Sequence, residues 1–339
     1  MKISIGTNVK EGPWGGGNLF AVNLRNFLIE NGHEVIFNLK DTDIDIILLT
    51  EPRKTSESSA FTHKECEDYK KYVKSDTVII HRINECDERK DTNFVNKYMI
   101  FSNRVADYTV FVSSWLKNLY ISQGIANNNL HTILGGADSE IFNTNNFNEF
   151  KGEGKIKIVT HHWGANWNKG FEIYNKLDGL LSKKEWSELF EFSYIGNLPK
   201  NFKFKNSKYI EPLSGTSLAD QLKKSNLYIT ASLNEPSGNH HMEGALCGLP
   251  VMYKDSGGVT EYCKNYGILF DAHSLESKIM EFKNNYQIYN DKMKTYPFTS
   301  KKMCENYLNL FHTAYANKKN VKRFKGNSYG KVLHSFRKK

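Results

Sequence analysis

Short apolar runs alternate with amphipathic stretches along almost the whole chain. Runs rich in Ile, Val, Leu and Phe predict buried β-strands. Between them, apolar residues recur at helical spacing, as at Leu19, Phe20, Leu24, Phe27 and Leu28. Strands that alternate with helices indicate an α/β fold with parallel sheets covered on both faces. The expected strands are residues 2–7, 34–38, 44–49, 77–81, 107–112, 131–134, 156–160, 192–195, 227–230, 250–253 and 267–270.

One polar, Asn-rich segment interrupts this alternation. Residues 143–155 (NTNNFNEFKGEGK) contain two glycines and few apolar residues, so we interpret them as a linker. We therefore predict two doubly wound, Rossmann-like domains that face each other across a cleft. Their expected bounds are 1–148 and 149–316, the second ending in a helix, followed by a basic tail at 317–339.

The net charge of +9 belongs to the tail. Lys318 to Lys339 hold nine of the 46 basic residues and no acidic one, which leaves 37 basic against 37 acidic residues in the body. The positive charge of the chain therefore says little about the activity of the body. Such a tail is not expected to join either core, because it buries too little apolar surface to offset its ordering entropy.

The remaining composition narrows the class of protein. With 339 residues, 39% of them hydrophobic, the chain can fill two cores. No apolar run approaches the roughly 20 residues that span a bilayer, and the N-terminus reads as a strand, so we expect a cytoplasmic protein. The five cysteines are scattered without a C-x-x-C pair, which predicts neither a disulfide framework nor a zinc site.

The most informative segment, EPSGNHHME, spans residues 235–243. It places Glu235 and Glu243 on either side of a predicted strand-to-helix turn that contains Gly238 and Asn239. A helix N-terminus offers free N–H groups and a positive dipole end, which suit phosphate or sugar hydroxyls. A carboxylate before the turn can hold a sugar, and one inside the helix can accept both ribose hydroxyls.

This segment and the two that follow it, GALCGLP at 244–250 and DSGGVTE at 255–261, resemble the E-x7-E region of a known family. That family is the retaining glycosyltransferases of family four (glycosyltransferase group 1), which have the GT-B fold. The resemblance implies that Glu235 is a catalytic residue contacting the donor sugar and that Glu243 binds ribose. It also implies that Gly238 and Asn239 bind the donor phosphates.

Two further segments resemble elements of the same family. Lys169, in HHWGANWNKG (161–170), matches a K-G element whose lysine pairs with the donor diphosphate, and lysine suits phosphate as a compact point charge. The family's usual arginine, five residues earlier, is replaced by Gly164. The triplet Gly15, Gly16 and Gly17 resembles a glycine loop that approaches the donor phosphates. It is not a G-x-G-x-x-G fingerprint, so no dinucleotide cofactor is predicted.

His81 is the last residue of the fourth predicted strand, and Arg82 follows it. In the family, a histidine from this region commonly contacts the donor sugar near the reacting carbon. The resemblance therefore implies that His81 is a catalytic residue. Arg82 is a candidate contact for phosphate or acceptor.

No metal site is predicted. Asp43-Ile-Asp45 spells D-x-D, the metal motif of the other large glycosyltransferase fold, but it opens a predicted strand. The histidine pairs at 161–162 and 240–241 are adjacent in sequence and are expected to point in different directions. We therefore expect a metal-independent enzyme without a cofactor.

The resemblance, which spans most of residues 1–316, implies a retaining enzyme that transfers a hexosyl or related sugar. The donor would be a nucleoside-diphosphate sugar, and the acceptor a hydroxyl of a glycan or a lipid-linked molecule. Two alternatives stay open: a GT-B-like sugar-nucleotide epimerase or phosphorylase and, more distantly, a nucleic-acid-binding protein acting through its tail. Nucleic acid is not an expected partner. The tail could instead lie on an anionic membrane, where each basic residue contributes about 1 kcal/mol, or remain solvated.

Overall fold

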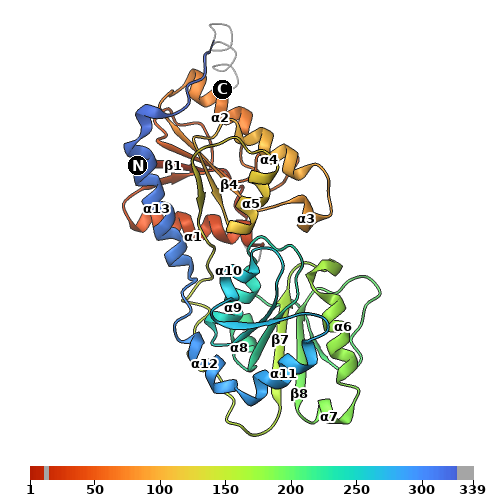
Figure 1. Ribbon diagram of the computed structural model, residues 1–339. Coiled ribbons are helices and arrows are strands. Elements are labelled where there is room, and N and C mark those ends of the chain that lie inside the picture. Colours follow the sequence, from red (N-terminus) through yellow and green to blue (C-terminus); the bar gives the residue numbers. More distant parts are fainter. Residues whose placement is uncertain (11–14, 327–339) are drawn as a thin grey trace. The chain divides into compact units, whose positions relative to one another are not determined.

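The computed structural model describes residues 1–10 and 15–326. They form two compact units, one of residues 1–134 together with 301–326 and one of residues 135–300 (Figure 1). Each unit contains one six-stranded sheet, and all the strand pairs are parallel. The prediction of two α/β units with parallel sheets is confirmed.

The first unit has the strand order β2-β1-β3-β4-β5-β6. The order reverses beside β1, as a doubly wound sheet requires. Its strands are β1 (Lys2–Ile5), β2 (Glu34–Ile36), β3 (Ile46–Leu49), β4 (Val78–Ile83), β5 (Tyr108–Phe111) and β6 (Leu130–Thr132). Its helices are α1 (Gly16–Glu30), α2 (His63–Tyr72), α3 (Asp87–Lys90), α4 (Val95–Asn103), α5 (Ser114–Ser122), α13 (Ser300–Ala316) and the short η2 (Lys318–Asn320).

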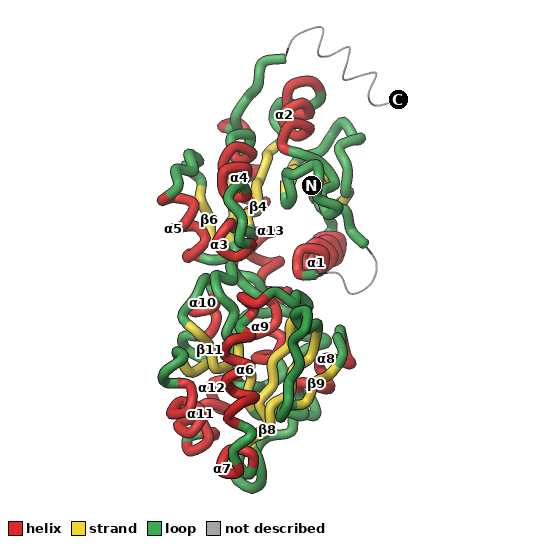
Figure 2. Tube along the Cα trace, turned by 90° about the vertical axis from the view of Figure 1, so that its right-hand side faces the viewer, coloured by secondary structure: helices red, strands yellow, loops and turns green. Residues whose placement is uncertain are grey.

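The second unit repeats this arrangement with the order β12-β11-β10-β7-β8-β9. Helices flank the strands in this unit too (Figure 2). Its strands are β7 (Ile156–His162), β8 (Phe190–Gly196), β9 (Lys208–Ile210), β10 (Leu227–Thr230), β11 (Val251–Lys254) and β12 (Gly267–Phe270). Its helices are η1 (Trp167–Lys169), α6 (Phe171–Leu180), α7 (Lys184–Ser187), α8 (Gly215–Leu222), α9 (Asn239–Leu246), α10 (Val259–Cys263), α11 (Leu275–Asn284) and α12 (Tyr286–Met293).

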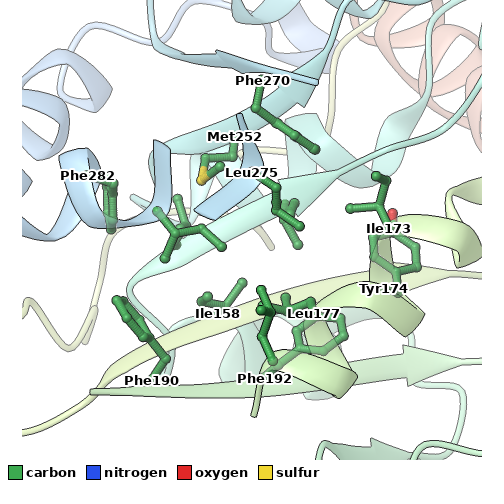
Figure 3. Packing of buried hydrophobic residues seen from close by; sticks show 14 of the residues in the cluster. Ile158, Ile173, Tyr174, Leu177, Phe190, Phe192, Met252, Phe270, Leu275 and Phe282 are labelled. Carbon is green, nitrogen blue, oxygen red and sulfur yellow. The ribbon is translucent and has the colours of Figure 1, made fainter. Parts of the chain in front are cut away.

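The largest core of the second unit lies between its sheet and helices α6 and α11. Figure 3 shows Ile158 and Phe192 of the sheet close to Leu177 of α6, with Phe282 of α11 in the same layer. These side chains are at most 2% exposed. This packing holds the ends of the strands in fixed positions, from which the loops of the candidate site emerge.

The unit boundaries differ from the predicted ones. The second unit begins at Gly135, because the chain from there onward bonds within it: Gly135 N donates to the Tyr262 hydroxyl, and Asn148 N donates to the Lys223 carbonyl. The segment interpreted as a linker therefore lies inside this unit. The final helix α13 was expected in the second domain, but Tyr307 and Phe311 pack in the core of the first unit.

The start of the tail is also part of a core, contrary to expectation. Val321 is 8% exposed within the first unit's main core, and Phe324 packs against a second cluster on that unit. Lys322 N donates to Asp107 Oδ1 at 2.7 Å. Val321, Phe324 and the hydrogen bond to Asp107 thus hold residues 318–326 on the first unit. Residues 327–339 lie outside the described chain. Across the described residues, no helix is long and apolar enough to cross a membrane.

Candidate functional site

The carboxyl ends of three neighbouring strands in the second unit, β8, β7 and β10, carry loops that bond to one another. Asn197, after β8, donates its side-chain amide to the Trp163 carbonyl after β7 at 2.7 Å. Leu233 N, after β10, donates to the Asn168 carbonyl at 2.8 Å. These loops therefore form one continuous layer at the sheet edge where ligands bind in α/β folds. This layer holds Lys169 and Glu235.

The turn between β10 and α9 depends on a glycine. Gly238 has φ of +81° and precedes α9, whose first residue is Asn239. A Cβ atom there would lie only 2.9 Å from the His240 ring. Both predicted phosphate contacts in this turn therefore lie where expected, at the start of a helix whose first N–H groups are not bonded within it.

Lys169 and Glu235 form an ion pair. Lys169 Nζ donates to Glu235 Oε2 at 2.5 Å, and the side chains are 11% and 8% exposed. Gly170, with φ of +103°, lets the chain next to Lys169 pass close to the loop after β10. A Cβ atom at this position would lie 2.6 Å from Ala231 Cβ. The structure thus brings together two residues that the sequence analysis assigned to different parts of a donor.

Glu243 contacts a residue to which the sequence analysis gave no role. His161, near the end of β7, has its Nε2 2.7 Å from Glu243 Oε2 and its Nδ1 3.1 Å from the Tyr228 hydroxyl. The sequence feature that could have indicated His161 is the polar pair His161-His162, which directly follows a predicted strand ending at residue 160. Glu243 is confirmed as lying on α9, one turn inside the helix.

Burial keeps the histidines next to this turn neutral at pH 7. Desolvation lowers the pKa of His240 well below its usual range and that of His241 to about 4. His241 donates from Nε2 to the Ser237 carbonyl at 2.6 Å. These rings therefore brace the turn as hydrogen-bonding groups. Within the described residues, no group of three or more His, Cys, Asp or Glu side chains could hold a metal ion.

The glycine triplet belongs to the first unit. Gly15 is the N-cap of α1, and Gly16 and Gly17 form its first turn, all three exposed. They follow β1, although residues 11–14 lie outside the described chain. The structure therefore confirms a glycine-rich helix start at the expected place in the fold.

His81 and Arg82 lie near the carboxyl end of β4, where His81 pairs with Leu49, the last residue of β3. Strand β4 continues to Ile83, so both residues lie within it, and His81 is completely buried beside Asn103. Burial lowers the pKa of His81 to about 3. Arg82 is 8% exposed, with its guanidinium 3.9 Å above the Phe20 ring. His81 and Arg82 therefore lie at the expected place in the fold with their side chains buried, and their contacts with a donor or acceptor stay a prediction.

Two exposed aromatic residues at the sheet edge of the second unit were also not predicted. Trp163 and Trp167 are 57% and 54% exposed, and both lie in the segment that leads to Lys169. Trp167 stacks on Phe171 with ring centroids 6.0 Å apart. Trp167 lies two residues before Lys169, and its indole packs on Phe171 with one face. Its exposed part adds an apolar surface to an otherwise polar edge of the sheet.

No model of a known protein family matches the chain, and no curated protein matches it in sequence. Solved structures do resemble it in fold. HepE from Anabaena, in complex with UDP-glucose, has a TM-score of 0.66 at 12% identity, covering 92% of this chain and 100% of HepE.

Two further structures give the same result. A glycosyltransferase from Rickettsia africae has a TM-score of 0.65 at 15% identity, covering 93% of this chain and 99% of its own. Sucrose-phosphate synthase from Thermosynechococcus elongatus has a TM-score of 0.61 at 12% identity, with coverages of 93% and 99%. The chain therefore has the two-unit α/β fold of the GT-B glycosyltransferases.

Proposed function

We propose that the protein is a glycosyltransferase that takes its sugar from a nucleoside-diphosphate sugar. The observation that carries this proposal is the grouping of Lys169, Glu235 and the start of α9 at the carboxyl edge of the second sheet. Glu243 lies one helical turn further along α9. The fold is shared with HepE, whose structure contains UDP-glucose. Both the residue types and their place in the fold suit a donor of this class.

In the proposed complex, the donor diphosphate takes the place of Glu235 as the partner of Lys169. The N–H groups at Gly238 and Asn239 stabilise the phosphate oxygens. By the resemblance to family four, the N–H groups of Gly15 to Gly17 also bind donor phosphates. Fixed donors of this kind stabilise the charge that develops on the leaving diphosphate. Glu235, released from Lys169, accepts hydroxyl groups of the sugar, while Glu243 accepts those of ribose.

The finer assignment follows the resemblance to family four. It comprises retention of the anomeric configuration through an oxocarbenium-like transition state and transfer of a hexosyl or related sugar. The acceptor would be a hydroxyl group of a glycan or of a lipid-linked molecule. The catalytic roles follow the same resemblance: Glu235 contacts the donor sugar, and His81, which is buried in β4, contacts it near the reacting carbon.

The proposal includes metal independence. Lys169 and the helix N-terminus supply the positive charge that Mg²⁺ supplies elsewhere. Turnover should persist in excess EDTA. Complete loss of turnover in EDTA, with recovery on addition of Mg²⁺ or Mn²⁺, would show that a metal is required.

The proposal also includes peripheral contact with an anionic membrane through residues 327–339, which contain Lys331, Arg337, Lys338 and Lys339. Sedimentation with phosphatidylserine-containing and neutral phosphatidylcholine vesicles at low salt tests this. We expect binding to the anionic vesicles only, and loss of binding after truncation at Gly326. Equal pelleting with both kinds of vesicle, or unchanged binding after truncation, would contradict the tail's role.

The central experiment is a donor screen. Purified protein is incubated with UDP-, GDP- and ADP-sugars, and the free nucleoside diphosphate is measured with and without simple sugar acceptors. A glycosyltransferase releases diphosphate slowly from one donor and faster with an acceptor. An epimerase would convert the sugar while keeping it nucleotide-linked, and a phosphorylase would need inorganic phosphate and would carry a coloured pyridoxal group. Either result would replace the proposal.

A further inference from the structure

The side chain of Glu243 is held by a chain of three groups. His161 Nε2 lies 2.7 Å from Glu243 Oε2, and the Tyr228 hydroxyl lies 3.1 Å from His161 Nδ1. We propose that His161 is a positioning residue that fixes the Glu243 carboxylate and thereby makes the site selective for ribonucleotides over 2′-deoxyribonucleotides. This inference rests on the proposed function, because it assumes a nucleoside-diphosphate donor.

The hydrogen bonds define which nitrogen of His161 donates to Glu243. An ionised carboxylate only accepts hydrogen bonds, so Nε2 must be the donor to Glu243. Nδ1, on the other side of the ring, lies 3.1 Å from the Tyr228 hydroxyl, and the same hydroxyl lies 3.3 Å from the His161 carbonyl oxygen. His161 N also donates to the same hydroxyl oxygen at 3.1 Å. Tyr228 therefore fixes the position of the His161 ring.

Tyr228 is itself fixed against the helix that carries Glu243. Its side chain is completely buried on β10. Gly244, the residue after Glu243, gives it room, because a Cβ atom at that position would overlap the tyrosine ring. The ring contact and the hydrogen bonds thus join β7, β10 and α9 into one support for a single carboxylate.

This support leaves most of the carboxylate available to a ligand. A carboxylate has about four acceptor positions, and His161 uses one of them on Oε2. The Glu243 side chain is 12% exposed, so a ligand at the sheet edge can reach it. The terminal torsion of glutamate is broad in energy, and the bond from His161 restricts it to one orientation. A carboxylate held in this way can accept both vicinal hydroxyls of a ribose.

Selectivity follows from the same geometry. A site built to hydrogen-bond a hydroxyl rejects an analogue without it, because its buried polar group then loses a partner. A freely rotating carboxylate can turn to water instead, so it discriminates less. The bond from His161 therefore affects the ratio of ribonucleotide to deoxyribonucleotide affinity more than it affects the binding of the diphosphate.

The test is calorimetric titration of the full-length protein with UDP, ADP and GDP and with their 2′-deoxy analogues. The variants are His161→Phe, which removes the donor, His161→Gln, whose amide reaches the Nε2 position, and Tyr228→Phe. The matched control is His162→Phe, because the neighbouring His162 has its Nε2 2.8 Å from the Tyr174 hydroxyl. Circular dichroism establishes that each variant is folded.

For the base that binds most tightly, we expect the ratio of deoxyribonucleotide to ribonucleotide Kd to fall about tenfold in His161→Phe. His161→Gln should restore most of the ratio, Tyr228→Phe should give an intermediate value, and His162→Phe should match the wild type. An unchanged ratio in folded His161→Phe would overturn the inference, as would an equal fall in His162→Phe. If His161→Phe does not fold, an unchanged ratio in Tyr228→Phe would overturn it. Absence of any nucleotide binding by the wild type would instead refute the proposed function itself.

Discussion

Lys169 Nζ lies 2.5 Å from Glu235 Oε2, although the two residues are 66 positions apart in the chain. The pair joins the loop after β7 to the loop after β10. Without a ligand, each charge neutralises the other in a site where both side chains are largely buried. Binding of a diphosphate would change the partner of Lys169 and leave Glu235 available to a sugar. In the protein without ligand, Lys169 and Glu235 therefore each use the other as their ionic partner.

Breaking this pair from one side should destabilise the protein. Lys169→Met leaves the Glu235 carboxylate without its cation, and removing one partner of a buried pair costs about 3–5 kcal/mol. The double variant Lys169→Met/Glu235→Gln should recover most of that loss, because no uncompensated charge remains. Urea unfolding followed by circular dichroism measures the effect. A double variant that is less stable than Lys169→Met would contradict this coupling.

The two glutamates should differ in their kinetic roles. Glu243→Ala should weaken nucleotide binding about tenfold or more, because it removes a charged acceptor from the ribose. Glu235→Ala should leave nucleotide affinity within a few fold and lower kcat by at least about 100-fold, because its partner is the sugar. Calorimetry and steady-state kinetics separate the two effects. If both variants have the nucleotide affinity and kcat of the wild type, the donor site does not include these two glutamates.

Most strands of both sheets and the position of the E-x7-E turn could be predicted from the sequence, because their signals are local. Runs such as residues 227–230 and 267–270 match β10 and β12 at both ends. Strand β9 (Lys208–Ile210) was missed, since its three residues are exposed or only half-buried and carry no apolar run.

Long-range packing explains the remaining differences. The spacing of apolar residues in α13 does not indicate which of the two cores the helix joins. Only the tertiary fold places Tyr307 beside Phe20 in the first unit. His81 is buried because β4 continues to Ile83. A polar residue at the end of an apolar run does not indicate that the strand continues. The contact between His161 and Glu243 joins residues 82 positions apart, a separation over which sequence spacing gives no information.

Stability should fall as the pH falls from about 6.5 toward 4. The folded-state pKa of His241 is about 4 against an ordinary value of 6.5, because the ring is buried. Between these values the unfolded chain binds more protons than the folded one, so the free energy of unfolding decreases with decreasing pH. His241 alone should contribute on the order of 2 kcal/mol of loss at pH 5.

Urea unfolding at pH 5, 6, 7 and 8 tests this dependence. His241→Gln keeps a donor near the Ser237 carbonyl but does not titrate, so its stability should change less across this range. His273→Gln, at an exposed histidine, is the matched control and should follow the wild type. Parallel curves for all three proteins would show that His241 does not cause the pH dependence.

The segment 318–326 should contribute to stability, whereas residues 327–339 should not be needed for it. Truncation after Asn317 removes Val321 and Phe324 from their clusters and leaves Asp107 without the N–H of Lys322. We expect a loss of about 2–4 kcal/mol, mostly from the two apolar side chains. Truncation after Gly326 should keep the wild-type Tm. Equal Tm values for both truncations would contradict the anchoring role of this segment.

The most direct test of the account is hydrogen–deuterium exchange of the full-length protein with and without a saturating nucleoside-diphosphate sugar from the donor screen. Bound donor should slow exchange at residues 163–170, which lead to and include Lys169, and at residues 231–243, which contain Glu235 and the start of α9. Edge strand β9, at the far side of the same sheet, should exchange at an unchanged rate. Protection confined to other parts of the chain, with 163–170 and 231–243 unaffected, would contradict the claim that this sheet edge binds the donor.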